Sequence, residues 1–275
     1  MEITELKITQ ADFERALPVA QSKNGYIFEA CAPFIKSEYA NFRNTVLEED
    51  GVQELQDNET LRDSVISAVC ARGFLNVFRQ LDVVLTNTGF GVVSTQDTAP
   101  ASQARVKALE DSIRLLALRD TRNCVYELVS LPEWGETAAA FMCIPNLCWD
   151  FEVMLNFAGL EVTYGNWQSA QPIIQGAIND ITNNISSDLM NTLLVFVRGV
   201  AYATPYDIQL ISDIKHTVAA RMASNEELYR QGLRNIIQYV ERNINAFEEY
   251  RDSDIYEARH YKGYENTKDS KMFVF

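Results

Sequence analysis

Residues 85–116, LTNTGFGVVSTQDTAPASQARVKALEDSIRLL, change character three times and indicate the fold class. A strand-like apolar run breaks at Asn87-Thr88-Gly89, where Asn and Gly tolerate the positive φ of a tight reversal, and it resumes at Phe90. An Ala-Pro-Ala-Ser sequence and an amphipathic helical pattern follow. The stretch therefore predicts a β-hairpin over residues 83–93, inserted between two helices.

Helical spacing of apolar residues flanks this predicted hairpin. Before it, apolar residues that recur every three or four positions predict a helix over residues 58–81. After it, Pro100 and Ser102 suit a helix start, because proline lacks only an N–H that the first turn leaves unbonded. The hairpin is thus expected to interrupt a helical chain.

The second part of the chain carries three more helix signals. One helix is expected to begin near Pro172 and to break at Ser186. Thr204 precedes a proline and is predicted to cap the next helix. The segment Ser224–Glu227 has the form of a capping box, in which a hydroxyl and a carboxylate three residues later each bond the other's backbone N–H.

The irregular segment 131–166 divides the chain into a helical N-terminal half, residues 1–135, and a helical C-terminal half, residues 136–275. Residues 253–275 return to aromatic and turn-forming types and are expected to form an extended arm or a second hairpin. The predicted fold class is mainly α, a helical bundle in two halves with inserted β-hairpins and a β-like C-terminal arm. A duplication of one unit stays open, since each half runs from long helices into a β-like segment.

Composition narrows the classes of partner. Lys+Arg 24 against Asp+Glu 38 gives the 275-residue chain a net charge of −14. This charge disfavours general affinity for nucleic-acid phosphates or anionic lipid, although an acidic surface can line a passage through which DNA slides. The start has no secretory pattern and no stretch is long and apolar enough to span a membrane, so synthesis in the cytoplasm and no membrane partner are expected. Five dispersed cysteines suit reduced core thiols rather than disulfides.

Motifs for chemistry are weak, and no catalytic, metal-binding or cofactor-binding residue is predicted. Gly89-Phe90-Gly91 begins like a dinucleotide loop, but Ser94 stands where the third glycine belongs. Asp213 and His216 share a helical face, and a partly buried histidine beside a carboxylate explains them better than a metal. The protein is therefore expected not to be an enzyme.

Three tryptophans, Trp134, Trp149 and Trp167, gather with other aromatic residues in the irregular middle of the chain. Such a cluster can bind a ligand such as a sugar. We favour a core between the two halves or a subunit contact, because buried aromatic clusters are more common than ligand sites.

Residues 82–93, followed by residues 99–106, resemble a family of tailed-phage and prophage proteins from gut anaerobes, most of them uncharacterised. The order of helix, GFGVVS hairpin, APAS cap and helix is similar to the head–tail connector, or adaptor, class. The resemblance implies a virion structural protein in the neck, made in the host cytoplasm, that forms a ring of identical subunits through which DNA passes. It also implies portal protein and tail or neck proteins as partners, with DNA only as passing cargo. The chain is longer than the simplest connectors, so the resemblance leaves its second half unexplained.

Assembly into a ring requires contact surfaces, and two segments are candidates. Hairpin edges can extend a neighbour's sheet, and the apolar end of the chain would be costly to leave in water. The predicted subunit-interface residues are Val84, Leu85, Phe90 and Val92. The predicted residues of an arm that docks on the portal or a neighbour are Tyr261, Tyr264, Phe273, Val274 and Phe275.

Other classes of function remain as alternatives. Within the virion, the nearest alternative is a tail-completion or tail-terminator protein. Outside it, the alternative is a cytosolic helical binding module that uses the aromatic middle, and a hydrolase comes last.

Overall fold

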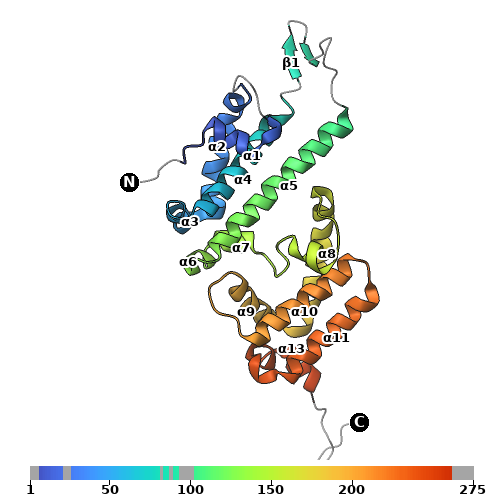
Figure 1. Ribbon diagram of the computed structural model, residues 1–275. Helices are drawn as coiled ribbons and strands as arrows, with labels where there is room; N and C mark the ends of the chain where they lie inside the picture. The colour runs from blue at the N-terminus through green and yellow to red at the C-terminus, as the bar shows by residue number, and fades with distance from the viewer. Residues whose placement is uncertain (1–5, 21–25, 81–82, 87–88, 93–101, 262–275) are drawn as a thin grey trace, which may run out of the picture.

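A computed structural model of the chain describes residues 6–20, 26–80, 83–86, 89–92 and 102–261. The helices form two lobes stacked end to end, with the β-strands at one end of the molecule and α13 at the other (Figure 1). The prediction of a mainly α fold is confirmed.

The first lobe is built around α4, which packs against α1, α2 and α5. Asn58 caps α4 by accepting a hydrogen bond from the Leu61 N–H at 2.9 Å, so the helix begins where the sequence predicts. The elements of this lobe are α1 (Gln10–Ala16), η1 (Pro18–Ala20), α2 (Tyr26–Phe42), the π-helix η2 (Arg43–Leu47), α3 (Glu48–Glu54), α4 (Glu59–Phe78), α5 (Gln103–Leu128), α6 (Pro132–Gly135) and α7 (Ala138–Cys143).

Between α4 and α5 the chain forms two short antiparallel strands, β1 (Val83–Thr86) and β2 (Gly89–Val92). Helix α5 then begins after Ser102, whose hydroxyl accepts a hydrogen bond from the Arg105 N–H at 3.4 Å. The strands therefore lie at one end of the first lobe, beside α4 and α5, which pack against each other (Figure 1).

The second lobe surrounds α10, which packs against α8, α11 and η3. The predicted break at Ser186 is confirmed, since its φ of 117° separates two helices. The predicted cap at Thr204 is confirmed as a capping box with Asp207. The elements are the π-helix η3 (Val153–Phe157), α8 (Tyr164–Ile185), α9 (Ser187–Val197), α10 (Pro205–Met222), α11 (Glu226–Arg242), η4 (Ile244–Ala246), α12 (Glu248–Arg251) and α13 (Asp254–His260).

Two predicted helix starts are wrong. Helix α8 begins at Tyr164, because the Thr163 hydroxyl caps it by accepting the Asn166 N–H at 3.1 Å, and Pro172 lies inside the helix. The capping residue of α11 is Asn225 rather than Ser224. Ser224 has a φ of 57°, a left-handed conformation that ends α10, so the next side chain becomes the first able to cap α11.

Each lobe has its own hydrophobic core. The first core draws its buried residues from 13–149 and the second from 147–250. Ala140, Ile144 and Trp149 belong to the first core although they follow the predicted division at 135/136. That division stays a prediction, while the change from one core to the other falls at residues 147–149.

The lobes meet where the end of α9 touches the end of α5 and the segment after it. Gly199, with a φ of +78°, comes so close to Val129 that a Cβ there would lie 2.0 Å from the Val129 carbonyl oxygen. A Cβ on Gly135 would lie 2.4 Å from the Arg198 carbonyl oxygen. Buried Arg198 donates from Nη2 to the Ile144 carbonyl oxygen at 3.0 Å. We call this contact the seam, defined by Val129, Gly135, Ile144, Arg198 and Gly199.

A second arginine joins the lobes on another side. Arg122 of α5 lies over the Phe151 ring at 4.0 Å and the Trp167 ring at 4.6 Å. Its Nη2 donates to the Trp149 carbonyl oxygen at 3.2 Å. Burial lowers the pKa of Arg122 to about 10, while the nearby carboxylate of Asp150 opposes this shift. The side chain stays charged at neutral pH and links α5 to aromatic residues of the second lobe.

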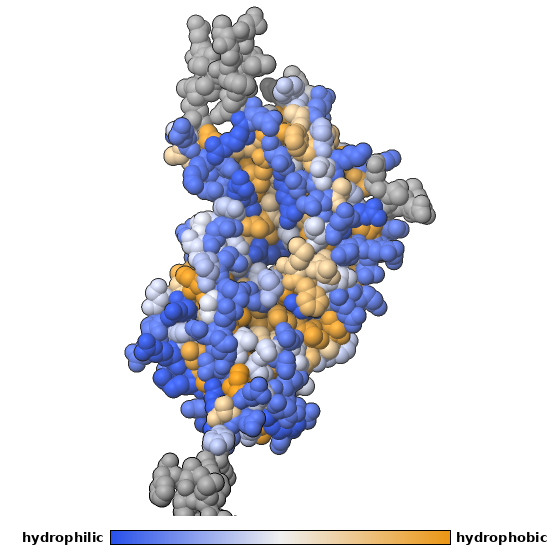
Figure 2. All heavy atoms as spheres, turned by 180° about the vertical axis from the view of Figure 1, so that it is seen from behind, coloured by the Kyte–Doolittle hydropathy of each residue, from blue (hydrophilic) through white to orange (hydrophobic). Residues whose placement is uncertain are grey.

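Apolar side chains also reach the surface around the waist between the lobes (Figure 2). Exposed large apolar residues include Phe141, whose ring lies 3.8 Å from the buried Arg198 guanidinium. Within the described part of the chain, no helix is both long and apolar enough to cross a bilayer.

The seam makes a testable prediction about Gly199. Replacing Gly199 with Ala should lower the free energy of unfolding by about 3 kcal/mol, because a Cβ is strained at positive φ and clashes with the Val129 carbonyl. Gly176→Ala is the matched control, since Gly176 lies in α8 with open space around it and should gain about 0.5–1 kcal/mol. Urea unfolding followed by circular dichroism measures both. Equal stability of the two variants would contradict the seam.

The cysteines provide a second prediction. Four of the five cysteines are buried and Cys143 is partly buried, so they lie in the core as expected. Burial raises the pKa of Cys31 and Cys143 to about 11 and that of Cys70 and Cys148 to about 12. Because the thiolate is the reactive form, Ellman's reagent at pH 8 should react slowly with the folded chain and rapidly with all five thiols after unfolding. A fast native reaction would contradict this packing.

Candidate functional site

The predicted interface residues Val84, Leu85, Phe90 and Val92 lie on β1 and β2. The register places Leu85 opposite Phe90 and Val84 opposite Gly91. The structure describes the backbone of these residues and not their side chains. Among the described strands, β1 and β2 pair only with each other, which leaves an outer edge on each. Such edges can pair with a strand of another chain.

A cluster of charged residues ties together the two helices that carry the strands. Glu110 on α5 accepts a hydrogen bond from Arg114 Nη2 at 2.8 Å. It accepts another at 2.9 Å from Nε of Arg79, the residue that directly follows α4. Hydrogen bonds from Arg114 and Arg79 hold the pKa of Glu110 below its usual value. The pair of helices beneath β1 and β2 is therefore fixed by ion pairs as well as by apolar packing.

The predicted arm over residues 253–275 is wrong at its start. Residues Asp254–His260 form α13, which Ser253 caps. Arg259 of this helix donates to the Tyr250 hydroxyl at 2.8 Å and to the Asn184 amide oxygen at 2.9 Å. The helix forms because the Ser253 hydroxyl accepts an N–H of the first turn and the arginine reaches α8 and α12, signals that the aromatic spacing of the tail obscured.

The remaining arm candidates lie beyond α13. Tyr261 follows the helix directly and is 75 % exposed, so it is accessible for contact. Tyr264, Phe273, Val274 and Phe275 lie outside the described residues. The docking role of the arm stays a prediction for residues 261–275.

Asp213 and His216, the pair weighed above as metal ligands, each contact other groups of the same chain. Asp213 accepts a hydrogen bond from Gln209 at 2.8 Å, and the His216 ring lies edge-on to Phe157 with centroids 4.6 Å apart. His216 Nδ1 is 2.9 Å from the Ser212 carbonyl oxygen. No group of three or more His, Cys, Asp or Glu side chains suited to a metal occurs among the described residues.

The three tryptophans in the middle of the chain are buried. Trp134 is fully buried and donates from its indole N–H to the Val46 carbonyl oxygen at 2.7 Å. Trp149 belongs to the first core and Trp167 to the second, and Arg122 connects them as described above. These side chains form the two cores and the contact between them, as the favoured interpretation of the sequence expected.

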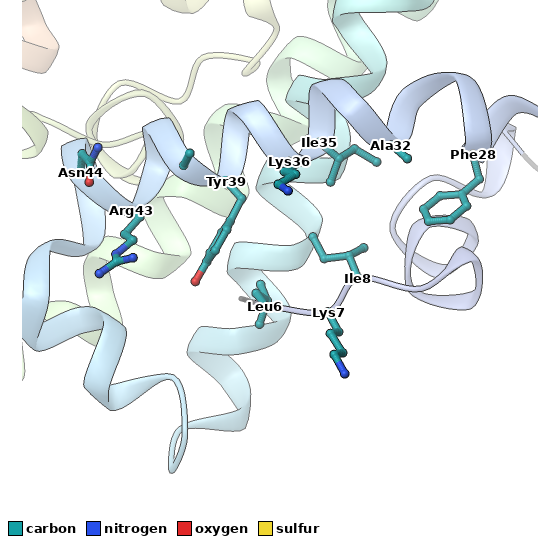
Figure 3. Close-up of a pocket in the computed structure, with 11 residues that line it drawn as sticks. Leu6, Lys7, Ile8, Phe28, Ala32, Ile35, Lys36, Tyr39, Arg43 and Asn44 are labelled. Atoms are coloured by element: carbon teal, nitrogen blue, oxygen red, sulfur yellow. The ribbon is translucent and has the colours of Figure 1, made fainter. Parts of the chain in front are cut away.

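A cavity of about 430 Å³ lies between α2 and the N-terminal segment of residues 6–8 (Figure 3). Leu6 and Ile8 face α2, and both pack against the first core. Three cationic residues line the same cavity. Burial raises the pKa of the Tyr39 hydroxyl, and the charge of Arg43 opposes this shift. The full lining is Leu6, Lys7, Ile8, Phe28, Ala32, Ile35, Lys36, Tyr39, Ala40, Arg43 and Asn44.

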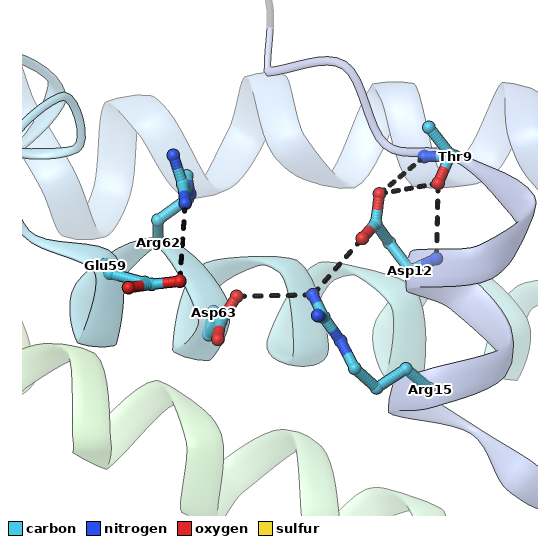
Figure 4. Close-up of polar contacts among 6 residues, drawn as sticks. All are labelled: Thr9, Asp12, Arg15, Glu59, Arg62 and Asp63. Carbon is cyan, nitrogen blue, oxygen red and sulfur yellow. Dashed lines mark hydrogen bonds and ion pairs between the residues drawn. The ribbon is translucent and has the colours of Figure 1, made fainter.

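The wall formed by residues 6–8 is anchored by the start of α1 (Figure 4). The Thr9 N–H donates to the Asp12 carboxylate at 3.0 Å, and the Asp12 N–H donates to the Thr9 hydroxyl at 3.3 Å. Arg15 bridges Asp12 at 3.2 Å and Asp63 of α4 at 3.3 Å. The hydrogen bond from the Thr9 backbone, above all, lowers the pKa of Asp12. Nothing in the sequence pattern had marked this cavity, because its walls come from segments about twenty to forty residues apart.

Comparison with known proteins gives one family match. A family described as "Family of unknown function (DUF6712)" matches residues 29–138. The match begins within α2 and ends at the first residue of α7, so it includes the strands and lies in the first lobe. No curated protein and no solved structure matches the chain.

The correction at the end of the chain makes a prediction about truncation. A chain ending at Asp252 should lose thermal stability, because it lacks α13 and its bonds to Tyr250 and Asn184. A chain ending at Tyr261 keeps α13 and should melt at the temperature of the full chain. Thermal unfolding by circular dichroism compares the two. Equal melting temperatures for both truncations would show that α13 adds nothing to the second lobe.

Proposed function

We propose that the chain is a head–tail connector, or adaptor, subunit that forms a homo-oligomeric ring in the neck of a tailed-phage virion. In this proposal the ring joins the portal protein to tail or neck proteins, and DNA passes through it without sequence-specific binding. The subunit is made in the host cytoplasm and acts in the virion. It carries no catalytic role.

The observation that carries the proposal is the pair of strands at one end of an elongated helical chain (Figure 1). Two strands of four residues have too little side chain to form a core of their own. Their outer edges pair with no other described strand, which suits pairing with a neighbouring copy. We infer that this inserted hairpin, with residues 261–275, supplies the contacts between subunits and with the portal.

The charge of the chain supports the proposal that DNA passes through the ring without binding to it. A net charge of −14 repels phosphates, so a ring built from such subunits lets DNA slide instead of binding it. The same reasoning applies to a tail-completion or tail-terminator protein, which differs in its place in the virion. A binding module that uses the aromatic middle gains no support, because Trp134 and Trp167 are buried.

The ring is tested by native mass spectrometry and negative-stain electron microscopy of the purified chain, alone and mixed with portal protein from the same phage. We expect a closed ring of identical subunits in one or both samples. Phe90→Asp should keep its helical circular dichroism and reduce the assembled fraction at least about tenfold, because a charge at a strand edge opposes pairing. Leu228→Asp, at an exposed apolar site on α11, is the matched control and should assemble normally.

Four results would count against the proposal. One is a monomer in both samples. Another is duplex DNA binding with a Kd below about 1 μM at physiological salt, which a sliding passage excludes. Normal assembly of the Phe90→Asp variant would remove the hairpin from the interface, and binding to tail tubes but not to portal would favour the terminator alternative.

A further inference from the structure

Helix α8 carries almost no charge in a chain that is highly charged elsewhere. Only Asp180 is charged among its 22 residues, whereas α11 carries six charged side chains in 17 residues. The Tyr229 hydroxyl donates to the Asp180 carboxylate at 2.9 Å, so even this charge has a partner. Helices that face water normally carry charged side chains on their outer face, and the cores of protein interfaces are depleted in them. The outer face of α8 therefore has the composition of a contact surface.

The uncharged residues of α8 form one continuous face. Residues three or four positions apart lie on the same side of a helix, and all six members of this set are exposed. A Cβ on Gly165 or Gly176 would meet no other atom within 4 Å, so the space in front of the helix is open at both positions. We call this set the α8 face, which consists of Gly165, Ser169, Pro172, Gly176, Asn179 and Asn183.

A protruding side chain and a hollow lie side by side near the middle of the α8 face. Ile173 is 40 % exposed and stands at the edge of the hollow. The hollow has a volume of about 290 Å³ and lies between α8 and the last turn of α10. A two-fold axis at this point places Ile173 of each copy against the hollow of the other, as a self-complementary contact requires. The hollow is lined by Pro172, Ile173, Gly176, Ala177, Asp180 and Arg221.

We propose that α8 packs antiparallel against α8 of a second copy of this chain, across a two-fold axis between residues 174 and 175. Side-chain amides carry both donors and an acceptor, so a face that contains them is complementary to itself. Two copies with a net charge of −14 repel each other where carboxylates meet, which leaves the uncharged face as the place of closest approach. A basic partner would instead be drawn to the acidic surface elsewhere on the chain.

The single charge of α8 favours the antiparallel orientation. In a parallel pair the two Asp180 carboxylates would lie opposite each other and repel. In the antiparallel pair they are separated along the helix axes by about 16 Å, because each residue adds about 1.5 Å. Each Asp180 then lies opposite Ser169 of the partner subunit, whose hydroxyl can donate to a carboxylate.

The proposed contact is small. A face about 33 Å long and roughly 10 Å wide offers on the order of 300 Å² per subunit. This area is less than half of the roughly 800 Å² per partner of a standard interface, so we expect a weak dimer with a Kd of about 100 μM. The inference goes beyond the ring proposal and does not depend on it, because α8 and the strands lie in different lobes.

Analytical ultracentrifugation of the full chain carrying Phe90→Asp tests the contact, because this change removes the strand contact proposed for the ring. We expect a monomer–dimer equilibrium that strengthens about twofold or more when NaCl is raised from 50 to 500 mM, since salt screens the repulsion between copies. Adding Ile173→Glu should weaken the dimer at least about tenfold. The matched control Val19→Glu adds the same charge at an exposed apolar site of the first lobe and should leave the dimer unchanged.

Cysteines introduced at two glycines of the α8 face report the orientation. Both positions have open space, so the substitutions are tolerated equally. The two copies of Gly176 lie about 4.5 Å apart along the helix axes, within reach of a disulfide. The two copies of Gly165 lie about 28 Å apart. Under mild oxidation, the Gly176→Cys variant should therefore form a linked dimer on a non-reducing gel, and Gly165→Cys should stay monomeric like the unmodified chain.

Several outcomes would overturn the proposal. They are a monomer at about 1 mM chain, a dimer that weakens at high salt, equal dimerisation of the Ile173→Glu and Val19→Glu variants, and equal crosslinking of the two cysteine variants. All of these measurements use the Phe90→Asp chain. A failure of ring assembly therefore leaves their results unchanged, and a failure of the α8 contact leaves the ring proposal standing.

Discussion

The close backbone contact at Gly199 is the constraint on which the arrangement of the two lobes depends. Only a residue without a Cβ can adopt its positive φ and lie against the Val129 carbonyl. This approach brings buried Arg198 to the Ile144 carbonyl, where the guanidinium gains hydrogen bonds that replace its lost water. Arg122 adds a second link through Phe151 and Trp167. The lobes are thus joined by arginines that contact carbonyl oxygens and aromatic rings, while each lobe keeps its own apolar core.

Local signals in the sequence were sufficient for much of the fold. Ser102 and Thr204 are strong caps whose hydroxyls reach N–H groups within three residues, so the starts of α5 and α10 could be predicted. The start of α8 could not, because Pro172 suggests a first turn although the tertiary structure holds it inside the helix. The π-helices η2 and η3 also lack a sequence signal. The seam depends on a contact between Val129 and Gly199, seventy residues apart, which no local pattern encodes.

The candidate functional surfaces also differ in how well the sequence predicts them. The strands lie where Asn87-Thr88-Gly89 suggested a reversal, since turn chemistry is local. The start of the predicted arm was wrong, because Tyr256 lies in a helix that Ser253 caps and packs against Tyr250 instead of extending. The cavity beside α2 arises where residues 6–8 meet that helix, and no local sequence pattern encodes such a contact.

The two separate cores have a consequence for the order in which the protein acquires its structure on the ribosome. Every buried residue of the first core has been synthesised by residue 149, including Ile144, whose carbonyl oxygen accepts the hydrogen bond from Arg198. Arg198 and Gly199 emerge about fifty residues later. We therefore expect the first lobe to collapse during translation and to present a finished template, onto which the second lobe folds and closes. Because the N-terminal lobe is made first, synthesis in this order limits incorrect packing between the helices of the two lobes.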